Sequence, residues 1–278
     1  MVALLFCLKN SIKERIFAVK KKRSKYLWIL SVATIAFILF IWWLVTDGMG
    51  IFTPNTLPSP IKIVQTFIKK LTDPNPDGAT LLAHLISSLK IVLSGYLLGV
   101  VLGVPLGIVM AWYEKADLMV RPVFDMIRTV PGIAWVPVMV VFLGIGFTSK
   151  AVVIFIGAVV ANVINAYSGI KQTKQVHLWV GATFGASNWQ LLRRIALPSA
   201  FPMIINGLKL SLGGAWTTIV AAELLASNKG IGYMIQQARG ILRPDIIIVG
   251  MFVIGIVGSL LMLPSSLIEK KVMKGGKW

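Results

Sequence analysis

The chain has 278 residues, of which 56% are hydrophobic and only 14% are charged. Soluble domains carry about 25% charged residues, so this composition excludes an ordinary soluble globular protein. The formal net charge of +18 could indicate nucleic-acid binding, but Lys and Arg are concentrated in segments between apolar runs, which instead indicates a membrane protein with no nucleic-acid partner.

Residues 1–25 combine an apolar start with a basic run and are expected to form an amphipathic lead-in on the inner membrane face. The basic residues follow the apolar run and no small-residue cleavage pattern occurs, so no signal peptide is predicted. Cys7 is the only cysteine, which excludes an internal disulfide.

Six apolar runs follow, each near the length of about 20 residues that crosses the hydrocarbon core. The predicted transmembrane helices cover 26–46, 87–112, 122–144, 151–170, 203–225 and 246–267. Lys and Arg are enriched in the segments that place both termini in the cytoplasm by the positive-inside rule. The predicted fold is therefore an all-α polytopic membrane protein, divided into 1–25, a first helix and outer loop at 26–86, a five-helix core at 87–267, and a basic tail at 268–278.

The outer loop contains a short segment, 59–71, whose apolar residues recur at helical spacing. This pattern predicts a helix lying flat on the outer surface, bounded by the helix breakers Pro74, Pro76 and Gly78.

Glycine recurs at every fourth position of the second predicted helix, as Gly95, Gly99, Gly103 and Gly107. Small residues at this spacing let two helix backbones approach closely in lipid. Glycine is also simply common in membrane helices, but four in register favour a packing seam. A weaker stripe of small residues occurs in the fourth predicted helix, at Gly157, Ala161, Asn165 and Gly169.

The third predicted helix contains Pro131 and Pro137, which should kink it. The kink either lies beside a pathway or reflects bent packing alone.

Polar and ionisable residues inside membrane spans are candidates for function. The candidate pathway residues are Arg128, Trp135, Asn162, Asn165, Lys209, Trp216, Thr217, Thr218 and Glu223. Arg128 and Lys209 could favour an anion in transit, although helix orientation and pairing between helices is the commoner role of such residues. Lys209 and Glu223 lie roughly 21 Å apart along one helix and are not expected to pair.

The sequence contains no Walker-type phosphate loop, CxxC motif or HExxH motif. His84 and His177 fall on opposite sides of the membrane in the predicted topology and cannot share a metal. No catalytic or metal site is therefore predicted.

The segment 171–202 interrupts the apolar runs on the cytoplasmic side. A first short helix is predicted over 174–187, with Gly185 near its end as a breaker. A second is predicted to begin with Ser187 as its cap and to end at Pro198. Two short helices meeting at a glycine form a protruding knob, which indicates a docking element.

The stretch "GASNWQLLRRIALPSAFPMIINGLKLSLGGAW" resembles the EAA loop and following helix of ABC importer permeases. Gly185 occupies the glycine position of that pattern, and Ile195, Leu197 and Pro198 occupy its later positions. The stretches "LPSPIKIVQT", "RTVPGIAWVPVMVVFLGIG" and "GIGYMIQQAR" are similar to the nitrate/sulfonate/taurine branch. The resemblance covers about residues 50–278.

This resemblance implies the type I ABC importer permease fold in a bacterial inner membrane. It implies a homodimer, two ATP-binding cassette ATPase subunits that bind the ATP, an extracytoplasmic solute-binding protein, and a small, anionic solute. The chain itself would need no cofactor. The implied ATPase-docking residues are Trp179, Val180, Gly181, Phe184, Gly185, Ala186 and Ser187.

One feature departs from the family pattern. Trp179, Val180 and Gly181 occupy the Glu-Ala-Ala positions, so the acidic residue is missing and the docking surface should be more apolar. The alternative function is a self-sufficient secondary transporter or channel, for which inverted repeats or a filter-like segment would be expected. A membrane enzyme would need a catalytic cluster, which the sequence lacks.

Overall fold

The computed structural model describes residues 26–53 and 55–275, and the predicted lead-in 1–25 lies outside the described residues. The chain separates into two compact units, residues 1–65 and 66–278. The described residues of both units form helices and connecting loops without a strand, which confirms the predicted all-α class.

The first unit contains an apolar helix from Tyr26 to Gly48, with a mean hydropathy of 2.4. Its last turn is the π-helix η1 (Leu44–Gly48). The helix predicted over 59–71 is present as α2 (Pro60–Thr72), which begins in this unit. The apolar side chains Ile61 and Val64 are exposed on it.

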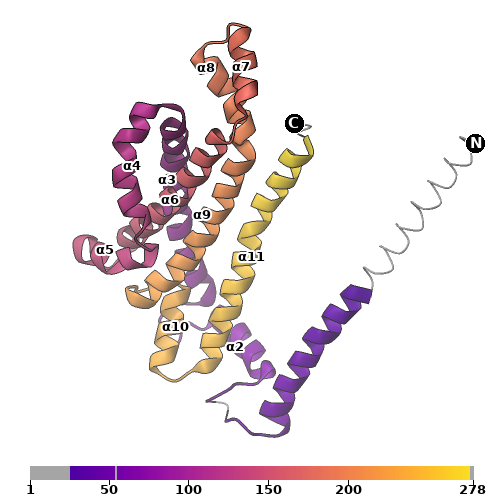
Figure 1. The fold of residues 1–278 in the computed structure, drawn as a ribbon. Helices are drawn as coiled ribbons and strands as arrows, with labels where there is room; N and C mark the ends of the chain where they lie inside the picture. The colour runs from indigo at the N-terminus through magenta and orange to yellow at the C-terminus, as the bar shows by residue number, and fades with distance from the viewer. Residues whose placement is uncertain (1–25, 54, 276–278) are drawn as a thin grey trace, which may run out of the picture. The chain divides into compact units, whose positions relative to one another are not determined.

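The second unit is built on four long helices that pack in succession (Figure 1). They are α3 (Leu81–Trp112), α6 (Phe147–Lys171), α9 (Leu197–Leu225) and α11 (Pro244–Gly275). At one end, α10 (Ile231–Gly240) connects α9 to α11, and at the opposite end α7 (Gln175–Thr183) and α8 (Asn188–Leu191) protrude (Figure 1).

The single predicted helix over 122–144 is wrong. The structure has α4 (Glu114–Arg128) and, after a break, η2 (Gly132–Ala134) with α5 (Trp135–Leu143), and the two parts are bent by 80°. Pro131 has an extended backbone, with ψ 138°, and has no N–H to continue the helix. Pro137 lies in the first turn of α5, where proline is tolerated.

Length and apolarity allow five of the described helices to cross a membrane, or six if the bent pair counts as one span. The first, second, fourth, fifth and sixth predicted spans each overlap one of the five. In the third span the sequence predicts a kink but not a break with a bend of 80°, because the size of a bend depends on packing around it.

The four glycines of α3 lie against α6. A Cβ atom on Gly99 would lie 2.4 Å from the Cβ of Ala158, and one on Gly107 would lie 2.6 Å from the carbonyl oxygen of Val163. Gly95 and Gly103 are equally buried on this face. Any larger residue would force the backbones apart, so α3 and α6 are held at close range.

The weaker stripe in α6 does not form one seam. A Cβ atom on Gly157 would meet open space, whereas Asn165 packs against Gly207 of α9. Gly169 also faces α9, because its Cβ would lie 3.0 Å from the carbonyl oxygen of Ala200. α6 therefore uses one face for α3 and another for α9.

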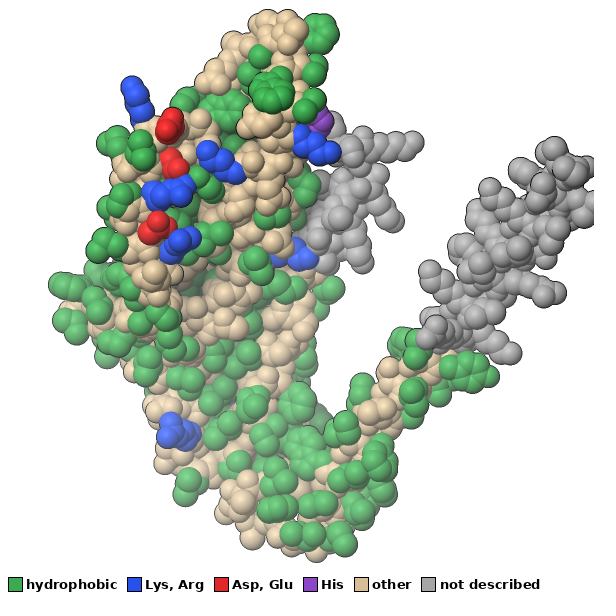
Figure 2. Space-filling model, in the orientation of Figure 1, with side chains coloured by type: hydrophobic (Ala, Val, Ile, Leu, Met, Phe, Trp, Pro, Cys, Tyr) green, Lys and Arg blue, Asp and Glu red, His purple; other side chains and the backbone are tan. Residues whose placement is uncertain are grey.

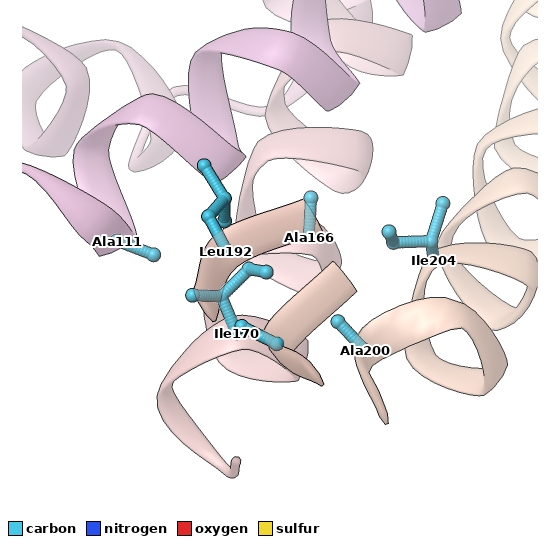
Figure 3. Close-up of a cluster of buried hydrophobic side chains, with 7 residues drawn as sticks. Ala111, Ala166, Ile170, Leu192, Ala200 and Ile204 are labelled. Atoms are coloured by element: carbon cyan, nitrogen blue, oxygen red, sulfur yellow. The ribbon is translucent and has the colours of Figure 1, made fainter. Parts of the chain in front are cut away.

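A buried hydrophobic cluster joins the protruding end to the long helices. Figure 3 shows side chains of this cluster drawn from α3, α6, η3 (Leu192–Ala196) and α9. Its buried members are Ala111, Ala166, Ile170, Leu192, Ala196, Ala200 and Ile204. Because Leu192 follows α8 directly, the cluster anchors the base of the protrusion.

Candidate functional site: an exposed knob and a buried polar cluster

The protruding end, here called the knob, consists of residues 171–194 and contains α7 and α8. Gly185 connects the two helices with φ +77°, a conformation that favours glycine. Ser187 caps α8, since its Oγ accepts from the N–H of Gln190 and the Oε1 of Gln190 accepts from the N–H of Ser187 at 2.8 Å. The predicted glycine break and serine cap are both confirmed.

The predicted stop at Pro198 is wrong. Residues Asn188–Leu225 form one continuous helical segment of 38 residues. Pro198 has no N–H to donate, and the preceding turns widen into the π-helix η3, which accommodates the missing bond. The knob is therefore continuous with α9.

The outer surface of the knob is apolar. The exposed fractions of Trp179, Phe184 and Trp189 are 65%, 87% and 60%. Gly181 lies on the packed side of α7, because a Cβ atom on it would lie 2.7 Å from side-chain atoms of both Leu191 and Ile195. Figure 2 shows hydrophobic side chains over this end of the molecule.

No acidic residue occurs between 171 and 202. The charged residues of the knob are all basic and exposed, namely Lys171, Lys174, Arg193 and Arg194. Exposed apolar surface of this kind, here with basic flanks, is typical of a site that binds a partner.

The candidate pathway residues contact different neighbours. Arg128 is half-exposed at the end of α4, with its Nε 2.9 Å from Oδ1 of Asp125. It lines a cavity of about 240 Å³ together with Arg121 and Tyr167. Arg121 forms hydrogen bonds with Asp117 and with the Tyr167 hydroxyl.

The polar candidates of α6 and α9 tie helices together. Oδ1 of Asn162 accepts from Ser211 at 3.3 Å, and Oδ1 of Asn165 accepts from the amide of Asn206 at 3.2 Å. Trp216 of α9 donates from Nε1 to the carbonyl oxygen of Ile254 at 3.0 Å, which links α9 to α11.

Four further candidates have different surroundings. Thr217 is exposed and bonds to the carbonyl oxygen of Gly214 in its own helix. Trp135 and Lys209 are partly buried, and Thr218 is also partly buried.

Glu223 belongs to a buried polar cluster at the α10 end. The Oγ of Ser88 donates to Oε1 of Glu223 at 2.8 Å, and the N–H of Gly232 donates to Oε2 at 2.9 Å. Only 1% of Glu223 is exposed. The carboxylate therefore joins α3, α9 and α10, and its side chain is closed off from solvent.

His84 extends the cluster. Its Nδ1 accepts from the N–H of Gly230 at 3.0 Å, and its Nε2 lies 3.2 Å from Oδ2 of Asp77. Oδ1 of Asp77 pairs with Lys70, whose ammonium group also donates to the carbonyl oxygen of Ala79 at 2.8 Å. We call Lys70, Asp77, His84, Ser88 and Glu223 the polar cluster.

The polar cluster contains one cation, Lys70, and two carboxyl groups, Asp77 and Glu223. Burial alone would raise the pKa of Asp77, but hydrogen bonds from His84 and Lys70 outweigh it and hold that pKa below its usual value. Lys150, also buried, donates to the Oγ of Ser227 at 2.6 Å near the same end. No group of three or more His, Cys, Asp or Glu among the described residues could hold a metal ion.

The sequence pattern places Glu223 among the pathway candidates and does not predict its hydrogen bond with Ser88. The available signal was the "GIG" stretch at 230–232. A Cβ on Gly230 would lie 2.1 Å from Oε1 of Glu223, and one on Gly232 would lie 2.5 Å from the carbonyl oxygen of Val220. Both glycines are present because the backbone passes directly over the carboxylate.

The helical arrangement, the continuous knob and the apolar spans define a transport permease. Residues 103–274 match the family described as binding-protein-dependent transport system inner membrane component. The chain belongs to this family, and the resemblance seen in the sequence is confirmed. It is a permease subunit of an ABC importer.

Three relatives illustrate the similarity. The taurine transport system permease protein TauC of Escherichia coli is 34% identical, over 90% of this chain and 93% of the relative. The putative aliphatic sulfonates transport permease protein SsuC of Bacillus subtilis is 33% identical over 92% of each. The nitrate import permease protein NrtB of Synechocystis is 32% identical over 82% of each.

Solved structures share the fold. An inward-facing MetNI methionine ABC transporter chain has a TM-score of 0.59 at 18% identity and covers 69% of this chain and 95% of its own. A chain of an amino acid ABC transporter has a TM-score of 0.60 at 14% identity, with 76% and 96% covered. The expected type I importer permease fold is confirmed.

Proposed function

We propose that this permease passes a small anionic solute across a bacterial inner membrane. The relatives named above are taurine, aliphatic sulfonate and nitrate permeases, and these solutes share a small oxyanion group. The cavity lined by Arg121 and Arg128 supports an anion, although Asp117 and Asp125 pair with these arginines.

The proposed assembly contains two copies of the chain, two ATPase subunits and an extracytoplasmic binding protein. The single observation that carries this proposal is the exposed apolar knob, continuous with α9. Each knob docks on one ATPase, and ATP-driven approach of the ATPases moves α9 and alternates access to the pathway. ATP is bound and hydrolysed by the ATPases, and the permease needs no cofactor.

The proposed topology places the knob and both termini in the cytoplasm and α10 on the outer side. The basic residues Lys171, Lys174, Arg193 and Arg194 support this orientation through the positive-inside rule. The polar cluster then lies at the extracytoplasmic end of the core.

The absence of an acid in the knob determines the chemistry of its partner surface. Trp179 replaces the family's acidic residue and is 65% exposed. The matching groove on the ATPase should therefore be apolar at its centre, with acidic residues at its rim to meet the basic flanks of the knob.

Removing residues 174–190 tests the docking role. The shortened permease should no longer co-purify with its ATPase, because the docking surface is gone. Unchanged co-purification would contradict the proposal. As a matched control, Phe142→Ala changes an exposed aromatic residue on α5, outside the knob, and should leave co-purification intact.

Transport by the reconstituted complex tests the solute class. Proteoliposomes that contain permease, ATPase and binding protein should take up taurine, an alkanesulfonate or nitrate only when ATP is supplied. Uptake by the permease alone would support the alternative of a secondary transporter or channel.

A further inference from the structure

A stripe of charged residues runs along α4. Asp117, Arg121, Asp125 and Arg128 follow one another at spacings of three or four, so they lie on one face of the helix. Figure 2 shows acidic and basic side chains gathered over the part of the molecule where Figure 1 places α4. This helix is therefore amphipathic, although it belongs to a span that the apolar pattern predicts.

The stripe extends to membrane depth. Phe124, one turn before Arg128, packs against Val163 of α6. Val163 is eight residues from the end of α6 at Lys171, which is roughly 12 Å along the helix axis. Charged side chains at such a depth face protein or a water-filled cavity and avoid lipid. The charged face of α4 is therefore expected to be wet, and in the proposed assembly it faces the transport pathway.

A cavity of about 240 Å³ lies between this face of α4 and the helices α3 and α6. Its apolar lining comes from all three helices, and its polar lining consists of Arg121, Asp125, Arg128, Tyr167 and Ser168. Small-molecule sites combine an apolar wall with a few polar groups that set orientation and specificity. The cavity suits a small solute with one anionic group.

Arg121 is held firmly by the protein itself. Its Nε and Nη2 donate to the two carboxylate oxygens of Asp117 at 3.1 and 2.7 Å, and Nη2 also donates to the hydroxyl of Tyr167. Its guanidinium lies 5.1 Å from the centroid of the Tyr167 ring. Bidentate pairs of this kind are strong and directional. Arg121 therefore joins α4 to α6 and is not available to a solute.

Arg128 has the same exposure but a looser partner. Both arginine side chains are 47% exposed. Among the residues that the structure describes, Arg128 has one charged partner, Asp125, whose Oδ1 lies 2.9 Å from Nε. Asp125 is itself 43% exposed, and exposed ion pairs are weak. A guanidinium has five N–H donors, so the Nη groups of Arg128 can bind a second anion.

We propose that Arg128 is the side chain of the pathway that selects the anion, and that Asp125 occupies it until the solute arrives. The oxyanion of the solute replaces the Asp125 carboxylate on the guanidinium, one anion for another. A solute without an anionic group cannot make this exchange, so the pair also rejects it. The inference rests on the function proposed above, because it assigns the anionic solute to one side chain.

Labelling of arginines with phenylglyoxal tests the exchange without transport. In full-length permease in lipid nanodiscs, Arg128 should react about tenfold faster than Arg121, because the hydrogen bonds of Arg121 to a carboxylate must first break. Peptide mass spectrometry measures each rate. Sodium methanesulfonate should slow the labelling of Arg128 more than sodium chloride does at the same ionic strength. Arg243, an arginine of similar exposure (45%) that does not line this cavity, should show no such protection.

Asp125→Asn removes the competing carboxylate. The methanesulfonate concentration that halves the labelling rate of Arg128 should then fall about two- to fivefold, the range expected for the loss of one exposed ion pair. Three results would overturn the proposal: equal labelling of Arg121 and Arg128, equal protection by chloride and methanesulfonate, or an unchanged half-protecting concentration in Asp125→Asn.

Uptake by proteoliposomes that contain permease, ATPase and binding protein connects Arg128 to transport. Arg128→Gln should lower the maximal rate of ATP-dependent taurine or nitrate uptake about tenfold or more, as expected for the loss of a charged hydrogen-bond donor. Arg128→Lys keeps the charge and should retain more of the rate. Lys115→Gln removes a cation from the first turn of the same helix, outside the cavity, and should transport as the wild type does. Wild-type uptake by Arg128→Gln would overturn the proposal.

The two experiments separate this inference from the proposed function. If the wild type takes up none of the named solutes but methanesulfonate protects Arg128, the solute class is wrong and the anion site stands. If the wild type transports them and Arg128 is not protected, the anion site is wrong and the proposed function stands. If Arg128→Gln does not assemble with the ATPase, the labelling of the unsubstituted protein decides.

Discussion

The two ends of the second unit use opposite chemistry. At the knob, aromatic side chains are exposed, with Phe184 at 87%, and the segment has no acidic residue. At the α10 end, a carboxylate, an imidazole and a lysine are buried at 2% exposure or less, and each contacts other groups of the chain. The knob thus leaves large aromatic side chains exposed, whereas the charged groups at the α10 end are buried among other groups of the chain. Substitutions should therefore alter association at the knob and stability at the α10 end.

Glycine substitutions should separate the two ends most strongly. Gly230→Ala should destabilise the protein by about 4 kcal/mol or more, because its Cβ would lie 2.1 Å from Glu223 in a strained backbone conformation. Gly185→Ala has positive φ but open space, so it should cost only about 1 kcal/mol. Thermal unfolding in detergent measures both, and equal losses would contradict the comparison.

The adjacent lysines of α2 provide a second contrast, also on stability. Lys70→Met should cost about 3 kcal/mol, because Asp77 is left buried without its cation. Lys69 is 74% exposed in its pair with Asp73, so Lys69→Met should cause little change in the unfolding temperature. Equal changes in the unfolding temperature for the two substitutions would contradict a buried ion pair between Lys70 and Asp77.

At the knob, Phe184→Ala should leave the unfolding temperature nearly unchanged, because the side chain contacts little of its own chain. Binding to the ATPase should weaken about tenfold or more, as for an aromatic residue at the centre of an interface. Titration of detergent-solubilised permease with purified ATPase measures the affinity. Trp179→Glu, which restores an acid, should also weaken binding to this permease's own ATPase, and stronger binding would argue against an apolar groove.

The smallest effect concerns pH and the Lys70–Asp77 pair. The pKa of Asp77 is lowered in the folded protein, so the pair's contribution is complete above the usual carboxyl range and is lost as pH falls through the folded value. The stability difference between wild type and Asp77→Asn should thus shrink as the pH falls below about pH 4. A stability difference that does not shrink at low pH would contradict this prediction.

Several local features followed directly from the sequence. The breaker Gly185, the cap Ser187 and the amphipathic helix α2 are set by residues within a few positions of one another. Two predictions made from prolines are wrong. Pro131 breaks the third helix where a kink is predicted, and Pro198 does not end a helix. In both cases the packing around the proline decides whether the helix bends, breaks or widens into a π-helix.

Composition and periodicity determined the class of the protein, the five long apolar helices and the place of the knob, because these depend on hydrophobicity along the chain. Only the tertiary structure decided that Ser88 and Glu223, separated by 135 positions, form a hydrogen bond, and that Gly230 covers the carboxylate. The polar cluster cannot be predicted from the sequence, because its members come from α2, α3, α9 and the loop before α3. Their meeting depends on which helices pack together across long distances in the sequence, which no local pattern encodes.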